Sequence, residues 1–343
     1  MILSRVFLFP YWLVLRLRSA RYDSGRRKGV RHPVPVISVG NVTAGGTGKT
    51  PMVEYLVRLL QDRGRVAVLS RGYKRRSKGF RVVESADTAD MAGDEPLQIK
   101  RKYPDVLVAV DKDRNAAIAR MLALPPEERP GVVLLDDGFQ YRKLKPAIDL
   151  VLVDYNRPVY QDELLPLGRL RDLPEHIRRA DAVVVTKAPE HLDDQDRSQL
   201  RRKLHLRPEQ PLFCSTIRYG DPLPVFPVEA DRRYVYSKEV FLFTGVADDR
   251  PLQVHLTDSY ERISHKRFGD HHRFTRGDLR DLAREVRRNP RLLLLTTEKD
   301  AMRLLHAGRV DAEVRRRLFY VPIETEFLTW EEKAAFDALA KNL

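Results

Sequence analysis

The sequence contains almost no cysteine: Cys214 is the single cysteine among 343 residues. One cysteine cannot form an intrachain disulfide, and the chain is consistent with a reducing compartment. Cys214 ends the short apolar run 212–214, so we expect a small buried hydrophobe there. A fold of this length must therefore be held by its apolar core.

Long apolar runs are also missing. The longest candidate covers residues 6–15 and is interrupted by Pro10, whereas a membrane-spanning helix needs roughly 20 apolar residues. Four arginines flank the run, namely Arg5, Arg16, Arg18 and Arg21, and Tyr11 and Trp12 lie within it. This pattern suits a helix at the headgroup boundary of a membrane, over residues 1–25. A helix docked on the protein's own core is the alternative. No small-residue cleavage motif follows, so we do not expect a secretory signal peptide.

Acidic residues are outnumbered. Lys and Arg total 62 against 48 Asp and Glu, which gives a formal net charge of +14. Such an excess favours anionic partners, namely nucleic acid, lipid headgroups or phosphorylated substrates, unless it reflects a generally arginine-rich composition. No basic-aromatic module for nucleic acid is recognisable, so we expect no nucleic-acid partner.

A glycine-rich segment at residues 40–50 carries the strongest signal. It follows a strand-like apolar run at 34–39 and precedes a helical pattern at 51–60. In that order, the loop glycines turn backbone N–H groups inward, Lys49 reaches the β- and γ-phosphates, and the Thr50 hydroxyl ligates Mg²⁺. The strict G-x-x-x-x-G-K-[ST] pattern would place glycine where the chain has Thr43. The predicted nucleotide-binding residues are Thr43, Ala44, Gly45, Gly46, Thr47, Gly48, Lys49 and Thr50.

Short β-branched runs alternate with helical patterns along the rest of the chain. The strand-like runs are 66–69, 106–110, 132–135, 150–153 and 182–185, and the helical segments between most of them are 51–63, 95–103, 113–122 and 192–204. Continuous apolar runs are typical of parallel strands covered on both faces. We therefore predict an α/β fold of the P-loop NTPase type, with a doubly wound, mainly parallel sheet over residues 26–206. Proline clusters after 207 indicate a smaller C-terminal α/β lobe over 207–343, beginning somewhere between 207 and 235.

Two groups of acidic residues follow apolar strands or open helices. Asp136 and Asp137 end the run at 132–135, where a phosphate-loop enzyme places the acid that holds Mg²⁺ directly or through water. In Gly93–Pro96 the sequence can be explained by helix capping, with Asp94 as the N-cap residue. Strand-to-helix turns nevertheless border the nucleotide crevice of such folds, so capping and chemistry are compatible.

Histidines are densest at residues 268–274, with His271 and His272 adjacent. The spacing does not suit zinc, because further ligands are missing. A histidine paired with a carboxylate, acting as proton acceptor for a substrate hydroxyl, and a plain surface loop both remain open. The segment 185–189 resembles a guanine-recognition signature but has Pro189 in place of the acid, which favours ATP over GTP.

These motifs together resemble the tetraacyldisaccharide 4'-kinase family of lipid A biosynthesis. The resemblance rests on SVGN at 38–41, TAGGTGKTP at 43–51, SRGY at 70–73, GDEP at 93–96, LDDGFQ at 135–140, LPLGRLR at 165–171, FGDHH at 268–272 and TEKDA at 297–301. The family's loop also lacks the first glycine, which accounts for Thr43. The motifs are in order and cover most of the chain.

The resemblance implies a kinase that moves the ATP γ-phosphate to the 4'-hydroxyl of an acylated glucosamine disaccharide 1-phosphate, forming lipid IVA. It implies a catalytic pairing of Asp94 with His271 and a functional Arg114. It also implies metal roles for Thr50, Glu95, Asp136 and Asp137. The implied location is peripheral, on the cytoplasmic face of the bacterial inner membrane, and we expect a monomer. The chain has Asp172 where the family usually has glutamate, so substrate contacts there stay open.

Two other classes of protein share single features with this sequence. A nucleotide-dependent switch or metallochaperone would need metal-binding cysteines and histidines or a guanine signature, and the sequence has neither. A nucleic-acid-binding ATPase is favoured by the charge but lacks a recognisable binding module.

Overall fold

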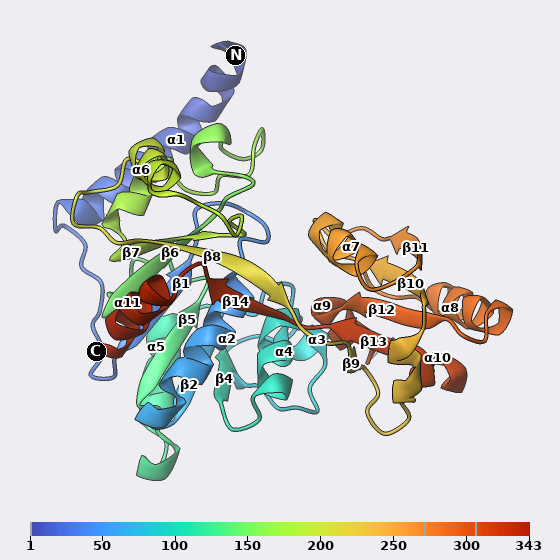
Figure 1. Cartoon of the computed structure of the whole chain (residues 1–343). Helices are drawn as coiled ribbons and strands as arrows, with labels where there is room; N and C mark the ends of the chain where they lie inside the picture. The colour runs from blue at the N-terminus through green and yellow to red at the C-terminus, as the bar shows by residue number, and fades with distance from the viewer. Residues whose placement is uncertain (1, 271, 306) are drawn as a thin grey trace.

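The computed structural model describes the chain except for residues 1, 271 and 306. It has two α/β lobes lying side by side, a larger one with the N-terminus and a smaller one formed by residues coloured orange in Figure 1. Each lobe is built on its own sheet, of nine and five strands respectively. The predicted fold class is confirmed.

The large sheet has the order β14-β8-β7-β6-β1-β5-β2-β4-β3. Its strands are β1 Val36–Gly40, β2 Val66–Ser70, β3 Arg81–Val82, β4 Leu107–Val110, β5 Val132–Asp136, β6 Ile148–Asp154, β7 Ala182–Thr186, β8 Leu212–Tyr219 and β14 Ile323–Phe327. The strands from β8 to β4 run parallel, while β3 and β14 pair antiparallel at the edges. The central strands β1, β2, β4, β5 and β7 are buried along their whole length, because helices cover both faces.

The helices of the large lobe fall into two layers. They are α1 Ile2–Asp23, α2 Lys49–Leu60, α3 Ala89–Ala92, α4 Asp94–Lys102, α5 Arg114–Leu122, α6 Asp194–Lys203 and α11 Trp330–Lys341. Residues of α2, α4 and α11 share one core cluster with the sheet. Residues of α5, α1 and α6 pack on the opposite side chains of the same strands. This is the doubly wound arrangement expected from the sequence.

The small lobe has a sheet of order β11-β10-β12-β13-β9. Its elements are β9 Leu223–Pro224, β10 Glu239–Thr244, β11 Arg262–Arg267, β12 Leu293–Thr297, β13 Leu318–Val321, α7 Arg250–Thr257, α8 Arg276–Arg288, α9 Glu298–Leu304 and α10 Ala312–Arg317. All pairings are parallel except that of β13 with β9. Short 3-10 helices lie at Gln61–Arg63, Pro126–Glu128, Val159–Gln161, Pro174–Arg179 and Arg232–Tyr236.

The boundary predicted at residue 207 needs correction. β8 pairs with β7 and with β14, so both belong to the large sheet. The chain thus leaves the large lobe after β8 and returns to it at β14, and α11 packs on the core of α2. The sequence does not show this arrangement, because the small lobe is inserted before the last strand and helix of the large lobe. Residues of β14 and α11 therefore follow the small lobe along the chain but pack in the large one.

α1 has a docked face and an open face. Its C-terminal half packs on the large lobe through Leu15 and Ser19, which are both buried, while Val14 is 60% exposed and Leu17 is 53% exposed. No helix in the described part of the chain is long and apolar enough to cross a membrane. Docking on the protein's own core therefore holds for one face of α1, and membrane contact by the exposed face stays a prediction.

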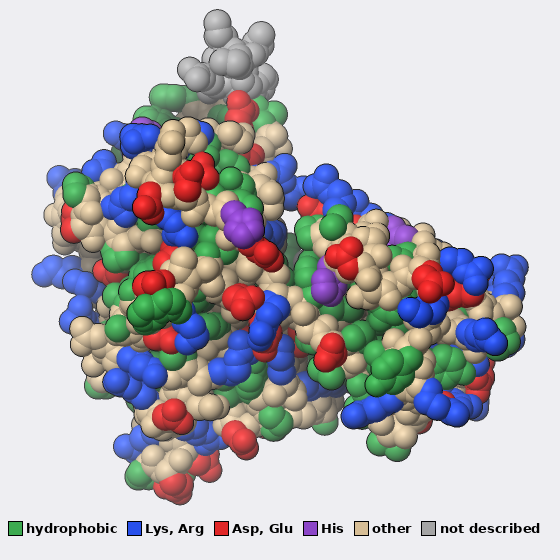
Figure 2. All heavy atoms as spheres, in the orientation of Figure 1, with side chains coloured by type: hydrophobic (Ala, Val, Ile, Leu, Met, Phe, Trp, Pro, Cys, Tyr) green, Lys and Arg blue, Asp and Glu red, His purple; other side chains and the backbone are tan. Residues whose placement is uncertain are grey.

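Lys and Arg side chains are spread over the visible face of both lobes and do not gather in a single patch (Figure 2). On this face the positive charge is thus distributed, as an arginine-rich composition would leave it. It does not by itself identify a binding face.

Candidate active site

The phosphate loop lies between β1 and α2, as predicted. Gly45 and Gly48 have φ values of 112° and 79°, which side chains with a Cβ rarely adopt. The loop is held by side chains around it: Asn41 Nδ2 donates to Thr47 Oγ1 at 2.6 Å, and Lys187 Nζ donates to the Gly46 carbonyl at 2.6 Å. α2 begins at Lys49, so the positive end of its dipole faces the loop.

Asp137 stands at the centre of a cluster of charges. Its φ is 57°, an uncommon conformation for a residue other than glycine. Arg171 donates to both of its carboxylate oxygens, and Lys49 Nζ lies 3.5 Å from Oδ1. Burial acts to raise the pKa of Asp137, but the hydrogen bonds from Arg171 and the charge of Lys49 outweigh it and lower that pKa. Asp137 therefore keeps its negative charge and orients the side chains of Arg171 and Lys49 beside the loop.

Asp136 lies at the end of β5 and is completely enclosed. Ser70 Oγ donates to its Oδ2 at 3.0 Å, while its Oδ1 is buried with no hydrogen-bond partner among the described residues. Burial, and then the charges of Glu95 and Asp137, raise the pKa of Asp136 to about 7. An unsatisfied buried carboxylate oxygen is costly unless a ligand supplies positive charge.

The residues present fit Mg²⁺. Asp136, Glu95 and the Thr50 hydroxyl offer hard oxygen ligands, and Mg²⁺ binds through one or two carboxylates plus substrate phosphates. Among the described residues, no group of three or more His, Cys, Asp or Glu side chains is placed to hold a metal ion by itself. Mg²⁺ bound beside a nucleotide usually keeps several ligands from phosphate and water.

Asp94 and Glu95 begin α4 and are bound by the small lobe. Lys299 Nζ of α9 lies 2.5 Å from Glu95 Oε1, and Arg303 donates to Asp94 Oδ2 from Nη2 at 2.8 Å and from Nε at 3.0 Å. The charge of Lys299 lowers the pKa of Glu95 despite its burial. The predicted capping role for Asp94 is wrong, because the N-cap residue is Gly93 and no side chain caps the helix.

Arg303 is itself fixed from within the small lobe. Its Nη1 donates to Asp300 Oδ1 at 2.7 Å and to the Gly245 carbonyl at 3.1 Å. Asp300 also accepts from the Gly245 N–H at 2.8 Å. A Cβ at Gly245 would come within 3.0 Å of Asp300 Oδ1, so glycine suits this close approach. The loop after β10 and the start of α9 thus form one rigid support for the contact with Asp94.

The histidine segment is described only in part. His271 lies outside the described residues, so its pairing with Asp94 stays a prediction. His272 bonds Asp278 Oδ2 at 2.9 Å and stacks on Phe268, with the ring centroids 4.4 Å apart. These contacts fix the His272 ring within the small lobe.

Arg114 is buried at the start of α5 beside the acid pair. Its guanidinium lies over the Tyr141 ring, 4.9 Å from the centroid. Burial and then the neighbouring charge of Arg71 lower its pKa, while the charges of Asp137 and Asp136 oppose that effect. The structure therefore brings Arg71 and Arg114 into the same electrostatic field as the predicted metal ligands.

Three contributors to the site were given no role by sequence reasoning: Arg171, Lys299 and Arg303. Arg171 and Lys299 lie in two of the motifs on which the family resemblance rests, at 165–171 and 297–301. Those motifs were the signal in the sequence that could have identified them. Their partners could not be read from the sequence, because each pair joins segments far apart along the chain.

Comparisons with known proteins point to one family. The family model described as tetraacyldisaccharide-1-P 4'-kinase matches residues 1–343. The chain is 40% identical to the tetraacyldisaccharide 4'-kinase of Parabacteroides distasonis over 343 residues, covering 98% of this chain and 93% of the relative. It is 41% identical to that of Porphyromonas gingivalis over 335 residues, covering 96% and 93%.

A solved structure has a similar fold over nearly its whole length. The crystal structure of LpxK from Aquifex aeolicus in complex with ATP matches with a TM-score of 0.72 and 30% identity, covering 98% of each chain. With a family model over its whole length, close relatives over nearly all of it, and the phosphate loop and acid pair in place, this chain belongs to the tetraacyldisaccharide-1-P 4'-kinase family.

Proposed function

We propose that this protein transfers the γ-phosphate of ATP to the 4'-hydroxyl of a tetraacyldisaccharide 1-phosphate, which forms lipid IVA. The observation that carries the proposal is the contact of Lys49 with Asp137 at the mouth of the phosphate loop, in a chain that matches this kinase family from residue 1 to 343. The relatives named above bear the corresponding kinase name.

The nucleotide would bind along residues 43–50. Backbone N–H groups of the loop and the N-terminus of α2 face the phosphates, and Lys49 supplies a positive charge to the β- and γ-phosphates. Because phosphoryl transfer passes through a loose transition state, positioning and charge neutralisation dominate its catalysis. Asp137 and Arg171 hold Lys49 and the loop entrance in place before substrate arrives.

Thr50, Asp136 and Glu95 would hold Mg²⁺, with Asp137 beside them. When bound, the ion neutralises charge on the phosphate oxygens. Lys299 now contacts Glu95, so it keeps a positive charge at that carboxylate. Arg114 lies close enough to the acid pair for its charge to act on it.

Asp94 and His271 would act together as the acceptor of the sugar hydroxyl's proton. A carboxylate orients an imidazole and stabilises its charged form, and such general-base assistance contributes roughly 10²–10⁴-fold. Arg303 binds Asp94 through two hydrogen bonds, which fixes the carboxylate in one orientation.

The acylated acceptor would be met at an anionic membrane surface. The exposed apolar side chains of α1 and the basic residues around them suit the cytoplasmic face of the inner membrane, with the enzyme bound peripherally. The enzyme would act there as a monomer.

The direct test is incubation with γ-labelled ATP, Mg²⁺ and a detergent-dispersed lipid A disaccharide precursor, followed by chromatography of the lipid. Label should enter the lipid at the 4'-position and should require both Mg²⁺ and the acceptor. Release of label only as inorganic phosphate would contradict the proposal and favour a nucleotide-dependent switch.

A further inference from the structure

We propose that α1 is a positioning element of the phosphoryl-transfer site, in which Tyr11 and Arg18 hold Arg171 and Asp137 in register with the phosphate loop. The inference rests on the proposed function, because it assumes that Asp137 and Lys49 act on the nucleotide. It adds a second role to a helix whose open face suits a membrane.

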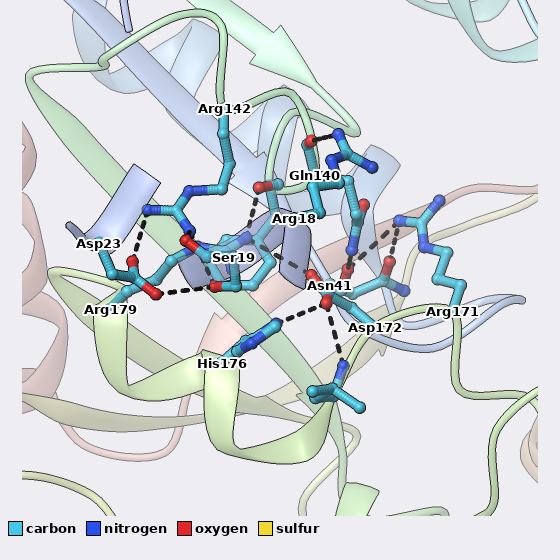
Figure 3. A network of polar contacts seen from close by, with 12 residues as sticks. Arg18, Ser19, Asp23, Asn41, Gln140, Arg142, Arg171, Asp172, His176 and Arg179 are labelled. Atoms are coloured by element: carbon cyan, nitrogen blue, oxygen red, sulfur yellow. Dashed lines mark hydrogen bonds and ion pairs between the residues drawn. The ribbon is translucent and has the colours of Figure 1, made fainter. Parts of the chain in front are cut away.

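The first link from α1 runs through Gln140, as Figure 3 shows. Arg18 Nη2 donates to the Gln140 carbonyl at 2.7 Å, and Gln140 Nε2 donates to the Asn41 carbonyl at 2.7 Å. Asn41 is where β1 passes into the phosphate loop, and its side chain is fully buried. Arg171 then donates to Asn41 and to Asp137 at once. Three residues, Gln140, Asn41 and Arg171, thus connect Arg18 to Asp137 through hydrogen bonds. Asp137 is the acid that faces Lys49.

The second link is shorter. Tyr11 Oη donates to the backbone carbonyl of Arg171 at 3.1 Å, in a partly buried contact between residues 160 positions apart in the sequence. Leu170, the neighbouring residue, is buried in the same apolar cluster as Leu15 of α1. The backbone that carries the Arg171 guanidinium is therefore held directly by the helix.

Further contacts fix the segment that follows Asp137. Arg142 Nη1 donates to Ser19 Oγ at 2.9 Å, and its Nη2 donates to Asp23 Oδ1 at 2.7 Å. The guanidinium of Arg179 lies 3.6 Å from the centroid of Phe139 and donates to its carbonyl at 2.6 Å. Residues 139–142 are thus clamped between the end of α1 and the 3-10 helix at Pro174–Arg179.

Asp137 needs such support because its backbone is in the left-handed region, with φ of 57°. A non-glycine residue stays there only when surrounding contacts determine its conformation. The contacts available on its C-terminal side are those of residues 139–142, and four hydrogen bonds join these residues to α1. Loosening α1 would let Asp137 and Arg171 move relative to Lys49, and small displacements at a reacting centre cost much rate.

Two matched pairs of variants on the same helix test this role. Tyr11→Phe removes one hydroxyl and keeps the ring, and Tyr22→Phe is its control because Tyr22 contacts Arg142 through its ring. Arg18→Gln removes one charge, and Arg16→Gln is its control because Arg16 forms an exposed pair with Glu175 at 3.4 Å. Within each pair the two substitutions change the side chain and its charge in the same way, and vesicle binding separates any difference in membrane attraction from the link to the site.

The measurement is kcat, acceptor KM and ATP KM in detergent micelles, with binding to anionic vesicles and Tm measured alongside. We expect Tyr11→Phe and Arg18→Gln each to lower kcat about five-fold, as loss of one hydrogen bond from a positioning chain would. The controls should stay within about two-fold of wild type, which is the error of such comparisons. Arg18→Lys, which keeps one donor, should recover part of the loss.

Equal kcat for each variant and its control would overturn the inference, as would a change confined to acceptor KM or vesicle binding. If Arg18→Gln does not fold, Tyr11→Phe decides by the same criterion. Failure of the proposed function is a different result: the wild-type protein itself would then transfer no label to the lipid.

Discussion

At the scale of single residues, the site consists of charges that neutralise one another in a space largely closed to water. Lys49 and Arg171 share Asp137, and Lys299 and Arg303 share the two acids of α4. Such pairs are worth more inside a low-dielectric site than on the surface. Removing one member leaves the charge of its partner less well neutralised, so single substitutions here should have large effects on rate.

Lys49→Ala should abolish transfer while the protein stays folded, because it removes the charge aimed at the β- and γ-phosphates. The loss should reach several kcal/mol of transition-state stabilisation. The measurement is kcat with γ-labelled ATP, beside circular dichroism for folding. Lys145→Ala, at an exposed lysine of the same lobe, is the control and should behave as wild type. More than about a tenth of wild-type kcat in Lys49→Ala would exclude the assigned role.

The proposed pair of Asp94 and His271 should behave as one unit. Asp94→Asn and His271→Ala should each lower kcat with little change in ATP KM, and the double variant should be scarcely worse than the worse single one. A histidine step in the rate–pH profile should vanish in His271→Ala.

His272→Ala is the control for that pair. It should lower Tm rather than kcat, because His272 bonds Asp278 and stacks on Phe268. Penalties that simply add, or a crippled His272→Ala enzyme, would show that the pair is assigned wrongly.

At the scale of elements, α1 presents different side chains to the protein and to the outside. Leu15 and Ser19 face the large lobe, whereas Phe9, Val14 and Leu17 are more than half exposed. Exposed apolar residues on a helix that is fixed in place suit insertion into the headgroup region.

Val14→Glu should weaken binding to anionic vesicles about ten-fold or more, because it replaces an inserted apolar side chain by a negative charge. Tm should hardly change, since Val14 is 60% exposed. The check is co-sedimentation with phosphatidylglycerol vesicles. Val228→Glu, at a position 95% exposed in the small lobe, is the matched control and should sediment like wild type. Unchanged sedimentation of Val14→Glu would assign membrane contact to another surface.

The elements differ in how well their sequences predicted them. Buried parallel strands such as β2, β5 and β7 were recognisable because both faces demand apolar residues. β11 was missed, since it is an edge strand of mostly exposed charged residues, Arg262–Arg267. Likewise, the acids at 136 and 137 were found from the strand before them, whereas the partner of Asp94 comes from α9, about 200 positions further along. Local patterns predict elements, but they do not say which distant side chains meet.

At the scale of the whole molecule, a buried triad joins the two lobes. Lys102 Nζ of α4 lies 2.6 Å from Glu54 of α2 and 3.2 Å from Glu298 of α9. One lysine cannot neutralise two buried carboxylates. Burial, and then the charge of Glu54, raise the pKa of Glu298 to about 7.

The triad should make stability depend on pH. A raised pKa in the folded state means that the folded protein binds a proton more tightly than the unfolded chain does. The contribution of Glu298 to stability is therefore present below its ordinary pKa near 4.5 and is lost as pH rises through about 7. The free energy of unfolding of Glu298→Gln should depend less on pH between about 5 and 8 than that of wild type. The variant's gain in stability over wild type should be largest near pH 8. Urea unfolding at both pH values measures this. Glu326→Gln, at an exposed position on β14, should keep the wild-type slope; an equal slope in Glu298→Gln would refute the assignment.

The path of the chain between the lobes has a consequence for biosynthesis. β8 gains its second neighbour only when β14 arrives, and the ring of Tyr55 on α2 packs against Phe327 and Phe336 from the last strand and helix. A nascent chain on the ribosome thus holds the helix that bears Lys49 with an uncovered apolar side until β14 and α11 have been translated. Chaperones have this interval in which to act, and a premature stop codon just before β14 should yield a product that quality-control proteases remove.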